Sequence, residues 1–330
     1  MSLLKKILHA LEFRTTGYHS LKQVEQAVYN DRKSPKMNLG QLQARENARL
    51  THVRHLGEVE FQVFSQFGDD GIIQWLQHHI PFKHKTFVEF GVENYRESNT
   101  RFLLLNNGWS GLVIDGSETH VREIQADPIY PVTDLQAVAS FITTDNINDL
   151  IRSAGFDEEL GILSVDIDGN DYWVWKAIHC VKPAVVITEY NALFGFEHPY
   201  TIPYQADFVR GTGALPFCCY GTSLRSACDL AEEKGYRFLG CNQAGNNAYF
   251  IREDLTGNVP VHYPTIEEGY RFATFTEIHT PGKGFTKGAE KVQFLDKLTL
   301  FNTRKNEPVI FNSREVLDSL NRAGKIPRKF

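Results

Sequence analysis

The sequence predicts a doubly wound α/β domain built on a mostly parallel, seven-stranded sheet. From residue 61 onward, five short apolar runs alternate with segments whose apolar residues have helical spacing. The runs are apolar at nearly every position, so both faces of each strand should be covered, which is typical of a parallel sheet. Two further runs flank the turn AGNN (244–247), which indicates an antiparallel hairpin that closes the sheet.

The predicted elements follow one another in regular alternation. Each apolar run has the length of a strand, and each helical segment carries one apolar face. Gly108, Gly155 and Gly235 end three of the helical segments, as expected for a residue that tolerates a left-handed conformation. The predicted strands are 86–92, 110–116, 138–146, 160–168, 183–191 and two arms within 236–254, and the predicted helices are 71–80, 98–109, 119–125, 147–155, 172–180 and 223–235.

Three regions are expected along the chain. Residues 61–255 form the α/β domain, residues 1–60 a helical N-terminal extension, and residues 256–330 a C-terminal extension that packs on the domain. Residues 1–12 are amphipathic. Their apolar face can dock on the domain, pair with a second subunit in a homo-oligomer, or rest on a membrane surface, and the sequence leaves these three open. That face consists of Leu3, Leu4, Ile7, Leu8 and Leu11.

Charge and composition limit the partners and the location. The formal net charge is −5, and duplex nucleic acid usually needs a basic face, so no nucleic acid partner is expected. No apolar run approaches the roughly 18–20 residues of a membrane-spanning helix, so no transmembrane segment is expected. The five cysteines form no CxxC pair, which favours reduced thiols and a cytoplasmic location.

Polar residues follow the apolar run of each predicted parallel strand. In an open parallel sheet, ligands bind at the carboxyl ends of the strands. A single acid at such a position is most often a helix cap, whereas acids at five successive strand ends indicate a polar site. The residues at these ends are Glu89 and Gly91, Asp115, Asp145, Asp166 and Asp168, and Glu189 and Asn191.

The loop after the first predicted strand, EFGVENYRESN (89–99), decides which ligand is expected. A dinucleotide site needs GxGxxG, so that a pyrophosphate can reach the helix N-terminus. This loop has one glycine, and the Glu93 carboxylate would repel a phosphate. A ligand with an amino group and no phosphate fits better, and S-adenosylmethionine is such a ligand. Asp115 would accept hydrogen bonds from its ribose hydroxyls, and Asp145 would meet the adenine.

Six segments of the chain resemble a known family. Together they look like the FkbM-type methyltransferases over about residues 61–255, and the segment at 163–178 is the most specific. The resemblance implies the class I methyltransferase fold, S-adenosylmethionine as donor, and an oxygen acceptor on a sugar or other small molecule. The first glycine loop is poorer in glycine than that of the family. The segments are FSQFGDDGII (64–73), FVEFGVENYRESNTRFLL (87–104), GWSGLVIDGS (108–117), LSVDIDGNDYWVWKAI (163–178), VVITEYNALFG (185–195) and YGTSLRSACDLAEEKGYRFLGCNQAGNNAYFIREDL (220–255).

Site residues are assigned on this basis. A hydroxyl acceptor must lose its proton, so a base or a metal ion is needed near the fourth and fifth strand ends. The segment FSQFGDDG is either a helix cap or, as the resemblance implies, a cover for the methionine end of the donor. The catalytic candidates are Asp166, Asp168, Glu189 and the loop residue His198, for which a structural role is the alternative. The expected donor contacts are Gln66, Asp69, Glu89, Gly91, Glu93, Asn99, Asp115, Asp145 and Asp166, and the expected acceptor contacts are Asn191, Tyr204 and Tyr220.

The segment DIDGND (166–171) keeps other interpretations open. An EF-hand loop is excluded, because counting from Asp166 places Asp171 where glycine is required and Ala177 where a carboxylate is required. A divalent ion held by Asp166, Asp168 and Glu189 or Asn191 is left open. A metal-dependent glycosyltransferase would use Asp166 and Asp168 as a DxD motif, although basic residues near the motif are missing. The third hypothesis is a non-catalytic relic that keeps the methyltransferase fold and binds a partner.

Overall fold

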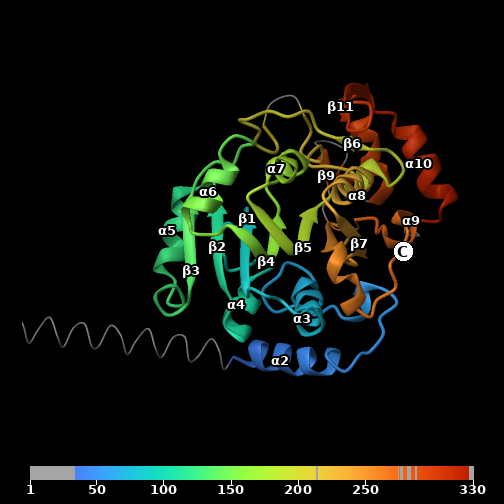
Figure 1. Ribbon diagram of the computed structural model, residues 1–330. Helices are drawn as coiled ribbons and strands as arrows, with labels where there is room; N and C mark the ends of the chain where they lie inside the picture. The colour runs from blue at the N-terminus through green and yellow to red at the C-terminus, as the bar shows by residue number, and fades with distance from the viewer. Residues whose placement is uncertain are drawn as a thin grey trace, which may run out of the picture.

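Seven strands form one sheet in the order β3-β2-β1-β4-β5-β8-β7 (Figure 1). The computed structural model describes residues 34–212, 215–273, 275, 278–280, 284–286 and 288–326. β1 to β5 are parallel, and β8 is antiparallel to both β5 and β7. The predicted sheet and its closing hairpin are confirmed. The strands are β1 (Thr86–Phe90), β2 (Ser110–Asp115), β3 (Leu135–Ala139), β4 (Glu158–Val165), β5 (Val181–Glu189), β7 (Tyr236–Cys241) and β8 (Asn247–Arg252).

Helices cover both faces of the sheet, which explains why the strands are apolar at successive positions. In β1, Phe87 packs into the core on one face and Val88 into the core on the other. In Figure 1, α2, α3 and α4 lie below the sheet and α6, α7 and α8 above it. The first set is α2 (Pro35–Asn47), α3 (Asp69–His79), α4 (Arg101–Asn107) and α5 (Glu118–Ala126), and the second is α6 (Ile147–Ser153), α7 (Asp171–Ala177) and α8 (Leu224–Glu233).

The third strand lies earlier in the chain than the sequence predicts. β3 covers 135–139 rather than 138–146, because its register with β2 pairs Gly111 with Leu135 and Asp115 with Ala139. β2 ends at Asp115, whose carbonyl accepts the Ser140 amide at 3.0 Å, and the pairing of β3 with β2 stops there. The apolar residues Phe141 and Ile142 belong to the loop over the sheet edge instead.

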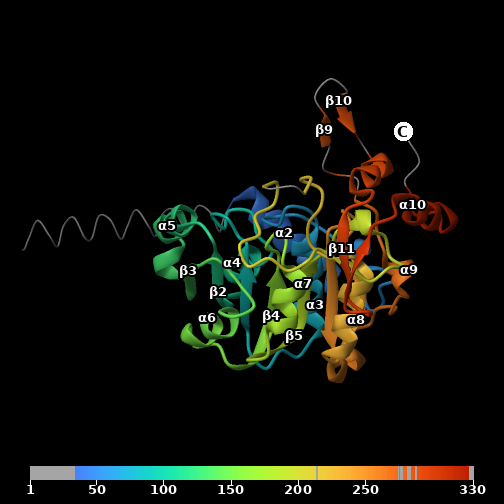
Figure 2. The ribbon, with the colours of Figure 1, turned by 90° about the horizontal axis from the view of Figure 1, so that it is seen from above.

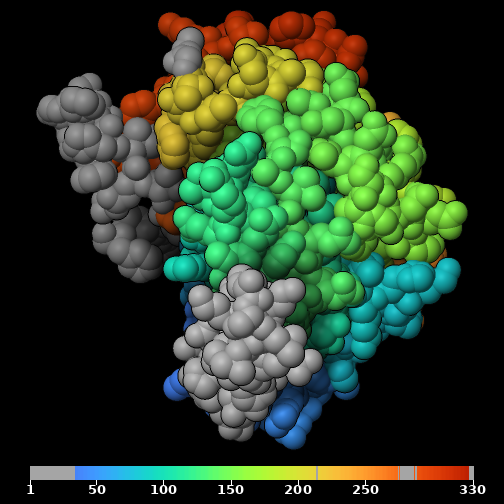
Figure 3. Space-filling model, turned by 90° about the vertical axis from the view of Figure 1, so that its left-hand side faces the viewer, coloured from blue at the N-terminus to red at the C-terminus, as the bar shows by residue number. Residues whose placement is uncertain are grey.

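Two smaller sheets and several short helices complete the described chain. β6 (Tyr200–Thr201) pairs with β11 (Thr299–Asn302), so the C-terminal segment joins the long connection between β5 and α8. Figure 2 shows β9 and β10 projecting away from the central sheet. In Figure 3 the connection from β5 to α8 (yellow) lies between the C-terminal segment (red) and the green part of the chain. The remaining elements are η1 (Leu56–Glu58), η2 (Tyr130–Val132), η3 (Ala192–Phe194), η4 (Glu253–Asn258), α9 (Ile266–Gly269), β9 (Ile278–Thr280), β10 (Gly284–Thr286), η5 (Gly288–Leu295), β12 (Glu307–Ile310) and α10 (Ser313–Arg322).

The N-terminal region is described from residue 34 onward, so the predicted amphipathic segment 1–12 lies outside the described residues. Helix α2 packs against α3 through the buried Met37. Val53 forms a parallel bridge with Val261, which joins the N-terminal region to the segment that follows η4. Among the helices that the structure describes, none combines the length and the apolar character needed to cross a membrane.

Candidate active site

Two adjoining cavities lie at the carboxyl edge of the sheet, where a parallel sheet is expected to bind its ligands. The first cavity, of about 410 Å³, opens between the ends of β2, β3 and β4. The second cavity, of about 320 Å³, opens between the ends of β1, β4 and β5. Six residues line both cavities and form their boundary: Gly91, Glu93, Asp166, Asp168, Arg210 and Phe217.

The loop after β1 passes close to the end of β4. Gly91 has a φ of +67°, and a Cβ at this position would lie 1.9 Å from the carbonyl oxygen of Asp166. Only glycine fits, because of both the backbone conformation and the space. The Gly91 amide donates to the carbonyl of Ile114 at 3.0 Å, which fixes the loop to the end of β2. The single glycine of this loop is therefore the one that the packing of β1 against β4 requires.

Asp115, the last residue of β2, lines the first cavity with a carboxylate that the protein itself holds in place. Oδ2 accepts the amide of Glu93 at 2.8 Å. Oδ1 accepts the amide of Ser117 at 2.8 Å and lies 3.1 Å from Nδ1 of His120. Each carboxylate oxygen has two lone pairs, so Asp115 can still accept hydrogen bonds from ligand hydroxyls. The predicted ribose contact stays a prediction, and this geometry allows it.

Asp145, the predicted adenine contact, is not brought to either cavity. It follows the end of β3 by six residues and is exposed, in the turn before α6. Ser140, Phe141 and Ile142 line the first cavity at this strand end instead. The sequence pattern placed the strand end too late, so the correction follows from the β2–β3 register.

Glu89 and Asn99 line the second cavity and are bonded to their own loop. The carboxylate of Glu89 accepts the amides of Asn99 at 2.8 Å and Thr100 at 3.1 Å, together with the Thr100 hydroxyl. Burial raises the pKa of Glu89 to about 7, although these hydrogen bonds favour its ionised form. Asn99 donates through Nδ2 to the Ser164 hydroxyl at 3.1 Å. The Glu89 side chain thus fixes the backbone at the start of α4. It also forms part of the wall of the second cavity, where it could contact a ligand.

The segment FSQFGDDG is shaped by Asp70. One oxygen of its buried carboxylate, Oδ2, accepts the amides of residues 63–65 at 2.7–2.8 Å and the Ser65 hydroxyl at 2.7 Å. Burial raises the pKa of Asp70 to about 6, against the effect of these hydrogen bonds. Asp70 therefore fixes the loop that leads into α3. It does not cap this helix, because Gly68 is the N-cap residue and no side-chain cap hydrogen bond is made there.

Asp69, a predicted donor contact, lies beneath the β7–β8 hairpin and outside the lining of both cavities. It accepts hydrogen bonds from Nδ2 of Asn242 and Nδ2 of Asn247, each at 3.1 Å, and from the Tyr249 hydroxyl. These bonds assign Asp69 a structural role, which corrects the prediction. Gln66 from the same segment does line the second cavity, and its role as a donor contact stays a prediction.

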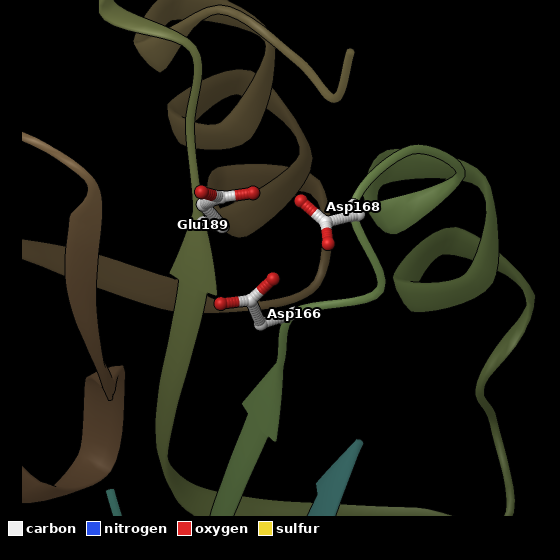
Figure 4. Close-up of side chains that lie close together, drawn as sticks. All are labelled: Asp166, Asp168 and Glu189. Carbon is white, nitrogen blue, oxygen red and sulfur yellow. The ribbon is translucent and has the colours of Figure 1, made fainter. Parts of the chain in front are cut away.

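The turn after β4 is held by the side chain of Asp171. The buried Asp171 carboxylate accepts the amides of Ile167 at 2.8 Å and Gly169 at 2.9 Å. Burial raises the pKa of Asp171 to about 6. Asp168 has a φ of +57°, a left-handed conformation that is uncommon for a residue other than glycine. The turn leaves the side chains of Asp166 and Asp168 directed toward Glu189 (Figure 4).

Asp166, Asp168 and Glu189 form what is called here the acid cluster (Figure 4). One oxygen of each carboxylate lies within 4.8 Å of the other two. Glu189 is 6% exposed, and its Oε2 has no hydrogen-bond partner among the described residues. Burial first, and then the neighbouring carboxylates, raise the pKa values of Asp166 and Glu189 well above their ordinary range. The structure thus brings together the three acids that the sequence grouped as catalytic or metal-binding candidates.

Arg210 is the residue of this site that the sequence pattern did not reveal. Its guanidinium pairs with Asp168, lies over the ring of Tyr220 at 3.6 Å from the centroid, and donates through Nε to the carbonyl of Phe217 at 3.0 Å. It is 42 residues from Asp168 and belongs to no motif. The available signal is that Arg210 is the single Lys or Arg between residues 183 and 224, within the segment expected to shape the acceptor pocket.

The three predicted acceptor contacts have structural partners. Asn191 donates through Nδ2 to the carbonyls of Cys218 at 2.8 Å and Tyr220 at 3.0 Å, and it caps η3. The Tyr204 hydroxyl is bonded to the amide and the hydroxyl of Thr144 at 3.2 and 3.0 Å. Neither Asn191 nor Tyr204 lines either of the two cavities. The Tyr220 ring packs against the Arg210 guanidinium, so Tyr220 contributes to the site by positioning Arg210.

His198, a predicted catalytic residue, is not brought to the acid cluster. Its ring stacks on Tyr200 with 5.0 Å between centroids, and Nε2 lies 3.4 Å from Oε1 of Glu315 in α10. It lines neither cavity. The sequence placed His198 near the fifth strand end, but the chain after β5 leaves the sheet edge and packs against the C-terminal segment. The alternative structural role of His198 is therefore the one that the structure favours.

Comparisons with known proteins give a likeness in fold. No family model matches the chain. No curated protein matches it in sequence. Similar solved structures include the "O-methyltransferase from Bacillus cereus in complex SAH", with 12% identity, a TM-score of 0.35, and coverage of 71% of this chain and 89% of that one. Another is "a putative caffeoyl-CoA O-methyltransferase from Staphylococcus aureus", with 15% identity, a TM-score of 0.35, and coverage of 71% and 99%. The "N-terminal domain of EvdMO1 with SAH bound" has 13% identity, a TM-score of 0.38, and coverage of 64% and 94%.

The strand order and directions define the class of fold. Five parallel strands in the order β3-β2-β1-β4-β5, followed by the antiparallel β8 and then by β7, form the mostly parallel seven-stranded sheet with a closing antiparallel hairpin that the sequence predicts. A dinucleotide-binding sheet of the same layered type lacks this inserted antiparallel strand. The fold predicted from the sequence is thereby confirmed, while the FkbM-type resemblance stays a prediction.

Proposed function

We propose that this chain transfers a methyl group from S-adenosylmethionine to a hydroxyl oxygen of a saccharide or other small molecule. The observation that carries the proposal is the meeting of the two cavities at Asp166. One cavity contains Asp115, which can accept ribose hydroxyls, and the other contains Glu189, whose carboxylate is buried and unpartnered. A donor in the first cavity and an acceptor in the second would meet at their shared boundary.

The lining of the first cavity suits the donor. Phe141, Ile142 and Phe208 offer apolar surfaces for an adenine ring. Glu93 and Asp166 stand at the boundary, where their negative charge favours a ligand with a sulfonium and an ammonium group and disfavours a pyrophosphate. S-adenosylmethionine therefore fits the residues present, and a nucleoside diphosphate does not.

The chemistry requires alignment and removal of one proton. When bound, S-adenosylmethionine supplies a methyl group on a positively charged sulfur. The acceptor oxygen bonds to the methyl carbon, the methyl–sulfur bond breaks with its electron pair left on sulfur, and the hydroxyl proton passes to the acid cluster. Holding both partners in line is worth up to about 7–11 kcal/mol in favourable models. An ionised carboxylate of the acid cluster would take up the proton, and burial together with the neighbouring carboxylates makes Asp166 and Glu189 stronger bases by raising their pKa values.

Calorimetry with the full chain tests the proposal. Titration with S-adenosylmethionine and with S-adenosylhomocysteine should give saturable binding, which Asp115→Asn weakens and the exposed control Asp145→Asn leaves unchanged. Incubation with a panel of saccharides should then add the mass of one methyl group to a product. Uptake of a UDP- or GDP-sugar with Mn²⁺, without S-adenosylmethionine binding, would establish the glycosyltransferase instead. Binding of neither donor would favour the non-catalytic relic.

A further inference from the structure

We propose that the acid cluster binds one divalent cation of the Mg²⁺, Mn²⁺ or Ca²⁺ class, and that this cation holds the acceptor through two neighbouring oxygen atoms. The cation site follows from the geometry of Asp166, Asp168 and Glu189. The statement about the acceptor also rests on the proposed methyl transfer. The two parts are therefore tested by separate measurements.

The spacing of the three carboxylates fits one ion. Hard divalent cations in proteins are bound by carboxylate oxygens. Two ligands of the same ion lie at most about 4.2 Å apart for Mg²⁺ and about 5 Å apart for Ca²⁺, which is twice the metal–oxygen distance. The oxygens of the acid cluster lie within 4.8 Å of one another. Ca²⁺ fits this spacing directly, and a smaller ion needs only a rotation of Asp168, whose side chain is 57% exposed.

Glu189 provides an observation beyond the clustering of acids. Only 6% of the surface of Glu189 is exposed, so this residue is more than nine-tenths buried. Its Oε2 has no hydrogen-bond partner in the described chain. A buried oxygen of a carboxylate is normally hydrogen-bonded, since leaving it without a partner is unfavourable. The other buried acids at this edge follow that rule: Asp171 and Glu89 each accept backbone amides. Glu189 points instead toward Asp166 and Asp168 (Figure 4), where an ion would complete its coordination.

The charge of the cluster also calls for a cation. Three carboxylates and one guanidinium, that of Arg210, carry a formal charge of −2 when ionised. Arg210 pairs with Asp168 and lies on the aromatic faces of Phe217 and Tyr220, so it offsets the charge on one side of the cluster. A divalent ion would offset the remainder. Like charges this close together, without a counter-ion, repel one another strongly in a partly buried site.

The number of protein ligands indicates the acceptor. Three carboxylates leave several positions of a six- to eight-coordinate ion free for water or substrate oxygens. These positions face the second cavity, which the residues of the cluster line. An acceptor that offers two neighbouring oxygens, such as a vicinal diol of a saccharide or a hydroxy acid, can occupy two of them. The ion would then orient the reacting hydroxyl and lower its pKa, so that its proton passes more readily to a carboxylate oxygen of the cluster that does not bind the ion.

Metal binding is measured on the full chain, freed of metal with a chelator and kept without donor or acceptor. Mn²⁺ titration followed by electron paramagnetic resonance should show one bound ion per chain with a Kd below about 1 mM, displaced by Mg²⁺ or Ca²⁺. Asp168→Asn and Glu189→Gln should each weaken Mn²⁺ binding by about tenfold or more, because each removes one charged ligand. The matched controls Asp145→Asn and Glu233→Gln lie outside the cluster and outside the lining of both cavities, and they should leave the Kd unchanged.

Three outcomes overturn the cation site: no Mn²⁺ bound at about 1 mM, equal Kd values in cluster and control variants, or displacement of Mn²⁺ by S-adenosylmethionine. The last would mean that the cluster holds the ammonium group of the donor. If Glu189→Gln does not fold, Asp168→Asn decides alone, since that side chain is largely exposed.

The acceptor class is tested by turnover with and without Mn²⁺. A saccharide with a vicinal diol should be methylated with Mn²⁺ and lose turnover after chelation, whereas a simple alcohol of similar size should be a poor substrate in both cases. Equal use of the two acceptors overturns the chelation. Mn²⁺ binding without methyl transfer leaves the cation site intact and counts against the proposed function, so the two failures are distinguishable.

Discussion

The two acid-rich segments of the chain look alike in the sequence and differ in the folded protein. Asp69 and Asp70, before α3, are buried. Asp69 accepts hydrogen bonds from the hairpin, and Oδ2 of Asp70 accepts four from the loop, although Oδ1 of Asp70 has no partner among the described residues. Glu189, at the end of β5, is also buried, but its Oε2 has no donor among the described residues, and Asp166, at the end of β4, is half-buried. The acid content of a segment thus says little about its role, and the hydrogen-bond partners decide it.

The difference has a physical basis. A carboxylate that accepts several backbone amides is stabilised as an anion and fixes the loop around it. A buried carboxylate without donors is destabilised as an anion, so it takes up a proton or a cation. The first kind holds the fold and the second kind is available for chemistry. The same chain therefore uses buried acids for two opposite purposes, about 100 residues apart.

The largest expected effect concerns the unpartnered acid. Glu189→Gln should lower turnover by about 10²–10⁴-fold, the usual contribution of a proton-transfer group. Donor affinity should change little, because Glu189 lines the second cavity and not the first. Steady-state kinetics and calorimetry with S-adenosylmethionine measure the two quantities. An equal loss of turnover and of donor affinity would show that Glu189 binds the donor. Glu189 would then not be the proton-transfer group that distinguishes it from the structural Asp70.

Replacing Asp70, whose Oδ2 accepts several hydrogen bonds, should lower the stability of the fold. Asp70→Ala removes the acceptor of four hydrogen bonds and leaves buried donors unsatisfied, so the free energy of unfolding should fall by about 3 kcal/mol or more. Thermal unfolding of the two variants makes the comparison direct. Glu189→Gln should unfold at the same temperature as the parent or higher, since it removes a buried charge. A similar loss of stability in both would contradict the distinction.

Asp115 lies between these two extremes, because its carboxylate has partners and also lines a cavity. Asp115→Asn places an NH₂ group against the amide of Glu93 or Ser117 and weakens any ribose contact. Donor affinity should fall by about 10–100-fold, which corresponds to roughly 1.4–2.8 kcal/mol. Calorimetry measures this effect, and His120→Gln serves as the control for a change in the same network. Unchanged affinity in Asp115→Asn would exclude the ribose contact.

The smallest expected effect is a change in pH dependence. The pKa of Glu89 is raised from about 4.5 to about 7, so the folded state binds its proton more tightly than the unfolded state. This contribution to stability is present below about pH 4.5 and is lost as the pH rises to about 7. Glu89→Gln should flatten that part of the pH profile of the free energy of unfolding. A slope identical to that of the parent between these pH values would show that Glu89 is ionised throughout.

Much of the fold and part of the site could be predicted from the sequence. β1, β2, β4, β5 and the hairpin appear where the apolar runs and the turn at 244–247 place them. Asp166, Asp168 and Glu189 were grouped correctly, because parallel strands carry their carboxyl ends to one edge. β3 was placed too late, since its bounds depend on pairing with β2. His198, Asn191 and Tyr204 were assigned to the site because they follow β5, and the course of that long connection is not a local property.

The sequence by itself determined the layered sheet and the set of acids at its edge, because apolar runs, turns and strand order are properties of neighbouring residues. The tertiary structure alone decided which acids have partners. Asp69 is bonded to residues 173 to 180 positions away, and Arg210 reaches Asp168 across 42. Such contacts form only when the packed core brings distant segments together, and they separate the acids that hold this protein in shape from those free to act on a ligand.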